Sequence, residues 1–121
     1  MGGIIIMTEK NTEEMNEQII FKLISFSGEA RSNIYEAYEL VMNGEYEKAE
    51  EYLKKADKTI LEAHSVQTSL IQKEAQGIHT DITLLMVHAQ DHLMSTLLTK
   101  DLIKNMIHMQ KEINELKEKI K

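Results

Sequence analysis

The chain has 121 residues, a length that fits one domain, and 42% of them are apolar, which is enough to bury a core. Its formal net charge of −6 argues against nucleic acid as a partner, and the absence of cysteine excludes disulfides, cysteine-ligated zinc and cysteine nucleophiles. Because no run of about 18 apolar residues is present, we expect a cytoplasmic protein without a membrane span.

Few residues interrupt regular structure, since proline is absent and glycine occurs only five times. The composition is dominated by Ala, Leu, Met, Glu, Lys and Gln, which all favour helices, so the predicted fold is all-α. Residues 1–11 are predicted to form a disordered or additional N-terminal segment. Residues 12–121 are predicted to form one three-helix domain.

The first helix is predicted over about residues 12–43, with Thr12 as its N-cap. Its apolar residues recur with the period of an α-helix: Met15, Ile19, Ile20, Leu23, Phe26, Ala30, Ile34, Ala37 and Val41. The same helix contains a segment of small residues: Ser25, Ser27, Gly28, Ala30 and Ser32. This segment predicts either the close approach of a neighbouring helix or room for a docking partner.

The second helix is predicted over about residues 45–76, after a turn in which Gly44 suits the left-handed position that follows a helix end. Gly77 is predicted to end this helix, and Thr80 or Asp81 to cap the next one. The predicted buried residues of the second helix are Ala49, Leu53, Ala56, Ile60, Ala63 and Leu70. Short connections favour antiparallel neighbours, so we expect an up-down-up three-helix bundle.

The third helix is predicted over about residues 81–120, and its first half is apolar on most faces. A three-helix bundle buries only one stripe of each helix, so the excess apolar surface predicts self-association. Its second half carries a regular seam of residues three and four apart: Met106, Met109, Ile113, Leu116 and Ile120. This seam fits either the core of the bundle or a coiled coil between subunits. The length of the helix favours the second interpretation.

A polar cluster interrupts the apolar part of this helix. Because an α-helix turns about 100° per residue, the cluster occupies roughly one third of the circumference and comprises His88, Asp91, His92 and Ser95. Such groups are costly to bury unless partners satisfy them. Three interpretations compete: a structural polar network, a metal site, and a histidine that accepts a transferred group on a ring nitrogen.

The support for metal-dependent hydrolysis at this cluster is weak. Histidines at positions i and i+4 can share an ion, but zinc requires three or four protein ligands. The spacing here is His-Ala-Gln-Asp-His, which lacks the glutamate base of helical metalloproteases. Of the remaining histidines, His64 is interpreted as a core residue bonded to a neighbouring helix, and His79 and His108 as turn or surface residues.

At these residues the chain resembles the lactose/cellobiose-specific enzyme IIA family of the bacterial sugar phosphotransferase system. The stretch MVHAQDHLMST over residues 86–96 carries the resemblance, and SGEARS (27–32), NGEYEKA (43–49) and EAHSVQT (62–68) agree with it. The resemblance covers roughly residues 12–108. The chain departs from the family pattern at the N-terminus and in the Lys/Glu-rich tail that follows His108.

The resemblance implies a homotrimer, a nine-helix bundle in which each subunit contributes three helices. His88 falls on the phosphorylated histidine of the family, with phosphate arriving from phospho-HPr and leaving to a cysteine of enzyme IIB. His92 and Gln90 fall on neighbours that bond the phosphoryl oxygens or orient His88. Asp91 falls on an aspartate at the trimer axis, where three copies gather around a divalent cation, expected to be Mg²⁺.

The implied function is that of a phosphocarrier in the uptake of a β-linked disaccharide of the cellobiose, lactose or chitobiose class. Contact with the membrane would be indirect, through the sugar permease. We expect an apolar collar of Leu84, Val87 and Met94 around His88 either to dock partner proteins or to form the trimer core. A catalytically silent helical module is the alternative function, and a metal-dependent hydrolase ranks last.

Overall fold

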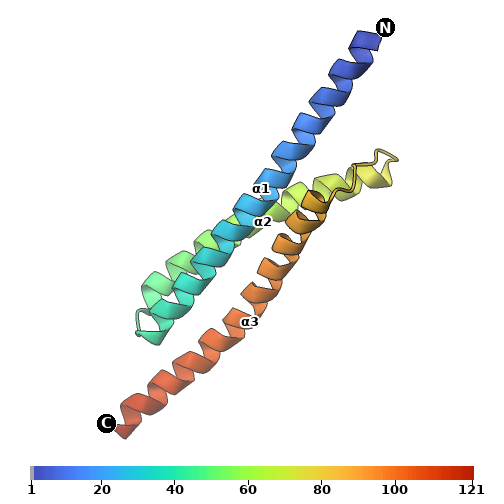
Figure 1. Cartoon of the computed structure of the whole chain (residues 1–121). Coiled ribbons are helices and arrows are strands. Elements are labelled where there is room, and N and C mark those ends of the chain that lie inside the picture. Colours follow the sequence, from blue (N-terminus) through green and yellow to red (C-terminus); the bar gives the residue numbers. More distant parts are fainter. Residues whose placement is uncertain (1) are drawn as a thin grey trace.

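The computed structural model describes the backbone of residues 2–121 and the side chains of residues 16–121. Three helices follow one another: α1 spans Gly2–Met42, α2 spans Tyr46–Ala75 and α3 spans Leu84–Ile120 (Figure 1). The described backbone contains no strand, so the predicted all-α fold is confirmed. α1 begins at Gly2, well before the predicted start at about residue 12, so the prediction that Thr12 is its N-cap was wrong. The predicted disordered or additional segment over residues 1–11 falls on residues whose side chains lie outside the described part, and it stays a prediction.

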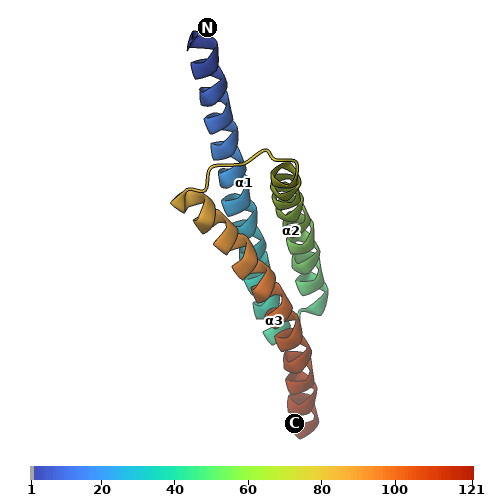
Figure 2. The ribbon, with the colours of Figure 1, turned by 90° about the vertical axis from the view of Figure 1, so that its right-hand side faces the viewer.

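The three helices form an open arrangement rather than a closed bundle. α2 runs antiparallel to both α1 and α3, so α1 and α3 point in the same direction (Figure 1). α1 packs along both other helices, whereas α2 and α3 barely touch, and Figure 2 shows the middle of α1 between them. The antiparallel three-helix topology is confirmed, but within one chain α3 packs almost entirely on α1.

Both predicted glycine positions end a helix as expected. Gly44 has φ of 78°, and the N–H of the following Glu45 donates to the carbonyl of Leu40 at 2.9 Å. The same pattern follows α2, where Gly77 has φ of 88°. A left-handed residue at this position lets the chain satisfy the last helical carbonyls, and glycine adopts it without steric cost.

α3 begins at Leu84, later than the predicted residue 81. Thr83 has an extended backbone, with φ of −102° and ψ of 164°, and its Oγ1 accepts a hydrogen bond from the N–H of Met86 at 3.1 Å. The prediction that Thr80 or Asp81 caps this helix was wrong. Thr83 supplies the N-cap, because its hydroxyl satisfies a first-turn N–H.

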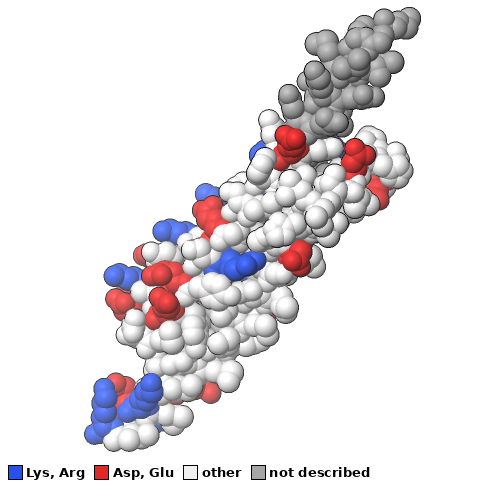
Figure 3. Space-filling view, in the orientation of Figure 1, with Lys and Arg blue, Asp and Glu red and all other residues white. Residues whose placement is uncertain are grey.

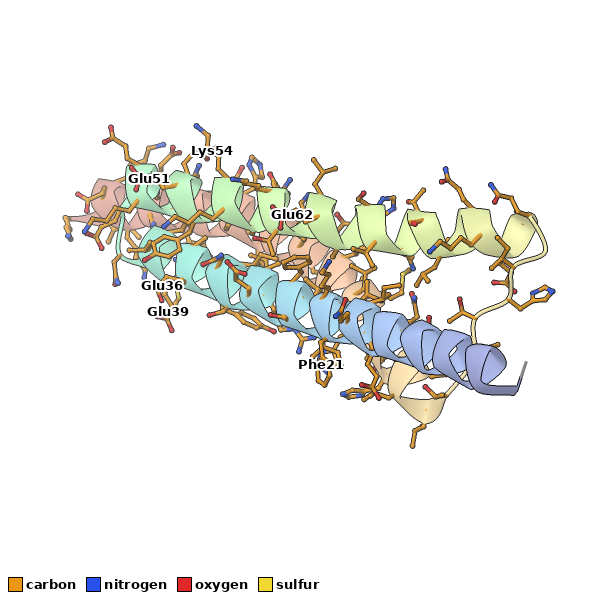
Figure 4. All side chains as sticks on the ribbon, turned by 90° about the horizontal axis from the view of Figure 1, so that it is seen from above. Phe21, Glu36, Glu39, Glu51, Lys54 and Glu62 are labelled. Carbon is orange, nitrogen blue, oxygen red and sulfur yellow. The ribbon has the colours of Figure 1, made fainter. Side chains whose placement is uncertain are left out.

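The core consists of two clusters along α1. The cluster near the α1–α2 turn contains Ala30, Ile34, Ala37, Val41, Ala49, Ala56, Ile60, Ile103 and Ile107. The cluster towards the start of α3 contains Ile20, Leu23, Ala63, Met86, Ala89 and Leu93. Alanine is frequent in both, which allows the helix backbones to approach closely. Charged side chains such as Glu39 of α1 and Glu51 of α2 project outwards instead (Figure 4).

The small-residue segment of α1 only partly serves helix packing. Ser27 and Ala30 are buried between the helices, whereas Gly28 is exposed. A Cβ atom added at Gly28 would meet no atom within 4 Å. Packing within the chain therefore explains Ser27 and Ala30, but it does not explain a glycine at position 28.

One face of α3 is apolar and exposed along the whole helix. Its members are three or four residues apart once Asp91 is included: Leu84, Val87, Asp91, Met94, Leu98, Leu102, Met106, Met109, Ile113, Leu116 and Ile120. We call this set the α3 stripe. Figure 3 shows that much of the surface over α3 is uncharged between the ends of the helix.

The α3 stripe includes the predicted seam of the second half of α3, which was interpreted either as the core of the bundle or as a coiled coil between subunits. Met109 and Leu116 are 59% and 57% exposed, so the seam is not the core of the single chain. The inward positions are instead taken by Ile103 and Ile107.

Among the described residues, no helix combines the length and the apolar character needed to cross a membrane.

Side-chain contacts join the C-terminal part of α3 to the α1–α2 turn. Asn114 Nδ2 donates to the carbonyl of Val41 at 2.9 Å and lies 3.0 Å from Tyr46 Oη. Lys111 Nζ lies 5.2 Å from the ring centroid of Tyr46. The side-chain amide is thus a second donor to a carbonyl near the end of α1, which also accepts a 3.0 Å hydrogen bond from the N–H of Gly44.

Candidate functional site

The structure brings together the two histidines that the sequence grouped. His88 and His92 lie one turn apart near the start of α3, and their Nε2 atoms are 3.0 Å apart. The ring centroids are 4.4 Å apart and the ring planes meet at 89°. Because a hydrogen bond needs one donor and one acceptor, one Nε2 carries a proton and the other a lone pair. His88 is exposed, whereas His92 is half-buried.

Arg31 of α1 reaches the second histidine from the other side. Its Nη2 lies 3.3 Å from Nδ1 of His92. This contact joins residues 61 positions apart in sequence and makes α1 part of the histidine site. Sequence reasoning missed this role, although Arg31 is the only arginine of the chain and lies in the SGEARS segment.

A buried hydrogen bond fixes α3 against α1 beside these contacts. Thr96, one turn after His92, donates from Oγ1 to the carbonyl of Ser27 at 3.1 Å. Both residues are buried, and Ser27 lies one turn before Arg31. The hydroxyl of Ser27 and the Nε of Arg31 have no partner among the described residues. The bond from Thr96 sets the register that places Arg31 near His92.

Gln90 lies on a different side of α3 from the histidine pair. Its Oε1 accepts a hydrogen bond of 2.7 Å from Nε2 of Gln67 on α2. These two glutamines line a groove of ≈ 390 Å³ between the end of α2, the following loop and the start of α3. No hydrogen bond joins Gln90 to His88 within the described chain, so the predicted assistance by Gln90 has no contact to support it there.

Asp91 stands in the α3 stripe, on the exposed side of the helix. Its Oδ1 lies 3.4 Å from Oγ of Ser95. Ala89 and Leu93, two positions to either side, are fully buried, so helix geometry directs Asp91 away from the core. Among the described residues no group of three histidine, cysteine or acidic side chains is placed to hold a metal ion. One chain therefore presents a single carboxylate at this place, and the predicted divalent cation at Asp91 stays a prediction.

The remaining histidines are all exposed. This agrees with the expectation for His79 and His108, and His108 Nε2 lies 3.4 Å from a carboxylate oxygen of Glu112. The interpretation of His64 as a core residue was wrong. Its neighbour Ala63 occupies the buried position. Because successive side chains are about 100° apart around a helix, the side chain of His64 points away from the core.

Exposed apolar residues surround the histidine pair. Leu84, Val87 and Met94, the predicted collar, are 86%, 53% and 55% exposed. On α1, Phe21 is also exposed and projects away from α2 (Figure 4). Ser27 of α1 and Thr96 of α3 are hydrogen-bonded to each other. Phe21 lies about two turns before Ser27, and His88 lies about two turns before Thr96. Since α1 and α3 run parallel, Phe21 and His88 are at a similar level.

Comparison with known proteins assigns the chain to a family. The family model "PTS system, Lactose/Cellobiose specific IIA subunit" matches residues 18–111. The lactose-specific EIIA component of Streptococcus mutans is 45% identical over 91 residues, which are 75% of this chain and 88% of that protein. The family match includes α3 up to residue 111, with its histidine pair.

Solved structures agree in fold as well as in sequence. The cellobiose-specific enzyme IIA of Bacillus anthracis has a TM-score of 0.79 and 44% identity, covering 82% of this chain and 91% of that one. The chitobiose IIA of Escherichia coli, solved in complex with HPr, has a TM-score of 0.70 and 34% identity, covering 81% and 95%. The chain therefore belongs to the lactose/cellobiose-specific IIA family of the sugar phosphotransferase system.

Proposed function

We propose that His88 is the residue on which this phosphocarrier holds its phosphoryl group. As a member of the IIA family the chain is a phosphotransferase component. The observation that supports His88 is its position: it is the exposed member of a hydrogen-bonded histidine pair, within a surface of exposed apolar side chains. A protein donor and a protein acceptor must both reach the reacting nitrogen, and the half-buried His92 is less accessible.

The proposed donor is phospho-HPr and the proposed acceptor is a cysteine of enzyme IIB. The similarity of this chain to a chitobiose IIA that was solved in complex with HPr supports phospho-HPr as the donor. This chain lacks cysteine, which fits the IIA step and not the IIB step. Transfer between proteins depends on positioning and charge stabilisation rather than on added covalent chemistry. We propose that the chain works in the cytoplasm, as IIA components do, on the route of a β-linked disaccharide.

Phosphoryl transfer to the purified chain tests this function. Phosphoenolpyruvate, enzyme I and HPr are incubated with the protein, and its intact mass is measured before and after acid treatment. We expect a gain of one phosphoryl group, which is acid-labile and absent from His88→Ala. His108→Ala is the matched control, because His108 is also an exposed histidine on α3. Absence of transfer to the wild-type chain would instead favour a silent helical module.

The α3 stripe supports a homotrimer as the working assembly. It exposes apolar side chains along all of α3, and water contact with so large an apolar surface is unfavourable. A second or third copy presents an equivalent stripe, and packing stripe against stripe converts three open bundles into one nine-helix bundle. Sedimentation equilibrium of the wild-type chain should give the mass of three chains. A monomer at micromolar concentration would contradict the trimer.

Asp91 is the proposed ligand of a divalent cation in this trimer. Stripe packing around a threefold axis would bring three Asp91 carboxylates together, and like charges in an apolar axis repel one another unless a cation or protons intervene. Carboxylate oxygens suit Mg²⁺, and the cation would neutralise the three charges. Titration with Mg²⁺ after chelation should show one ion per three wild-type chains. Asp91→Asn, which preserves the shape of the side chain, should bind it more weakly.

Threefold packing also gives Gln90 a role at the reacting histidine. Gln90 precedes Asp91 and His92 follows it, so the two side chains lie about 100° from Asp91 in opposite directions; Gln90 contacts α2 and His92 contacts α1. In a closed ring of three chains, one flank of each α3 faces the opposite flank of the next. Gln90 thereby faces His88 of the partner subunit, where its amide N–H groups are donors for phosphoryl oxygens.

Mixed trimers test this arrangement. His88→Ala chains cannot accept phosphate, and Gln90→Ala chains are expected to accept it slowly. When the two variants are mixed and reassembled, an intact His88 faces an intact Gln90 across some interfaces, so the transfer rate should recover. If mixing leaves the rate at that of the Gln90→Ala protein alone, Gln90 does not act between subunits.

A further inference from the structure

We propose that Arg31 is a positioning residue of this site. Its guanidinium holds His92 as the tautomer with the proton on Nε2, which in turn holds Nε2 of His88 as the nitrogen that carries the lone pair. This inference rests on the proposed function of His88 as phosphoryl acceptor. It assigns the reacting nitrogen and gives α1 a part in the chemistry.

The argument starts from what each group can donate. An arginine guanidinium offers only N–H donors and no acceptor. At 3.3 Å from Arg31 Nη2, Nδ1 of His92 must therefore present its lone pair. A neutral imidazole has one proton, so that proton is on Nε2 of His92. Nε2 of His88, 3.0 Å further on, must then accept, which leaves the proton of neutral His88 on Nδ1.

The surrounding structure holds Arg31 in place for this role. Arg31 is half-buried, and its Nε atom is completely covered. The bond from Thr96 to the carbonyl of Ser27, one turn before Arg31, fixes α3 against α1. A lysine would offer a single ammonium on a flexible stem, whereas the planar guanidinium is rigid and spreads several donors. Arg31 is the only arginine among 14 basic residues, and it occurs at this contact.

The proposed transfer step needs no exchange of protons. The lone pair of His88 Nε2 attacks phosphorus as the nitrogen–phosphorus bond of the phosphohistidine donor breaks, and the donor nitrogen takes that electron pair. The donor ring carries a proton on its other nitrogen, so it leaves as neutral imidazole. His88 keeps its proton on Nδ1. The N–H of His92 that had pointed at the lone pair becomes a donor to a phosphoryl oxygen. Arg31 touches neither phosphorus nor His88, so it acts only through His92.

The tautomers can be read directly from the whole, unphosphorylated protein. Long-range ¹H–¹⁵N spectra of the protein labelled with ¹⁵N-histidine distinguish a proton on Nδ1 from one on Nε2. The wild-type chain should show His92 with the proton on Nε2 and His88 with the proton on Nδ1. Arg31→Met, which keeps the length of the side chain but removes every donor, should give averaged nitrogen shifts for His92.

Transfer kinetics complete the test. Arg31→Met should accept phosphate from phospho-HPr about tenfold more slowly, the effect of losing one hydrogen bond to a charged group. Lys100→Met is the matched control: it removes a half-buried cation that pairs with Asp57 at 2.7 Å and touches neither histidine. Arg31→Lys should restore part of the rate and of the tautomer pattern. Circular dichroism verifies that each variant is folded.

Two results would overturn the proposal: an unchanged His92 tautomer in folded Arg31→Met, or a transfer rate equal to that of Lys100→Met. Failure of the proposed function has a different signature, because the wild-type chain would then take up no phosphate. If Arg31→Met does not fold, Arg31→Gln decides the matter. Its amide is able to accept as well as donate, so both His92 tautomers should appear.

Discussion

Replacing Thr96 by valine should weaken the joint between α1 and α3 by a predictable amount. Thr96 Oγ1 donates to the carbonyl of Ser27 at 3.1 Å, and Thr96 is completely buried. Valine preserves the volume, so the change removes the hydrogen bond and opens no cavity. The carbonyl of Ser27 keeps the bond from the N–H four residues later that any helix supplies. We therefore expect a loss of about 1 kcal/mol, the net value of one neutral hydrogen bond.

Ser27→Ala is the matched control on the other helix. Its hydroxyl is equally buried but has no partner among the described residues, so removing it should cost less than about 0.5 kcal/mol. Alanine is also the better helix former. Urea unfolding followed by circular dichroism, at one fixed protein concentration because an oligomer's stability depends on concentration, gives both values. For a chain of this length the valine variant should melt about 3–5 °C lower.

The double variant sharpens the comparison. Thr96 bonds the backbone of Ser27 and not its hydroxyl, so the two effects should add within about 0.5 kcal/mol. A Ser27→Ala cost as large as that of Thr96→Val would show that the hydroxyl is bonded after all. A Thr96→Val protein as stable as the wild type would show that this bond does not hold α3 in register.

Three further variants probe other features. Asp91→Leu should keep the trimer intact in EDTA, because it replaces converging carboxylates with apolar surface, and a monomer in sedimentation velocity would contradict this. Asn114→Ala should lower the free energy of unfolding by about 1 kcal/mol through loss of its bond to the Val41 carbonyl, and an unchanged urea midpoint would show that this contact is not stabilising. Gly28→Ala should raise stability by about 0.5–1 kcal/mol, since its Cβ meets no atom; destabilisation would mean that the space is filled.

Much of the fold follows from local signals in the sequence. Gly44 and Gly77 mark helix ends because only their left-handed φ closes the last turn without strain. The start of α3 was harder to place. Thr80, Asp81 and Thr83 are all capping residues within four positions, and Ile82 follows Asp81 as Leu84 follows Thr83. The choice among them depends on where α3 meets α1, which periodicity does not encode.

Only the contacts within one helix of the site could be predicted from the sequence. The spacing of His88 and His92 places them together on any helix, so the pair could be read from the sequence. The contact of Arg31 with His92 depends on the register of two helices far apart in sequence, and the partner of Gln90 on α2 depends on a second such register. These contacts arise from tertiary packing, which the helical period does not determine.

The location of the phosphoryl group tests the account most directly. The wild-type chain, labelled with ¹⁵N-histidine and phosphorylated by phospho-HPr, is examined by NMR for coupling between phosphorus and a ring nitrogen. We predict a single coupled nitrogen, Nε2 of His88, and no coupling at His92 or at the exposed His64, His79 and His108. A phosphoryl group on any other histidine, or none at all, would contradict the account.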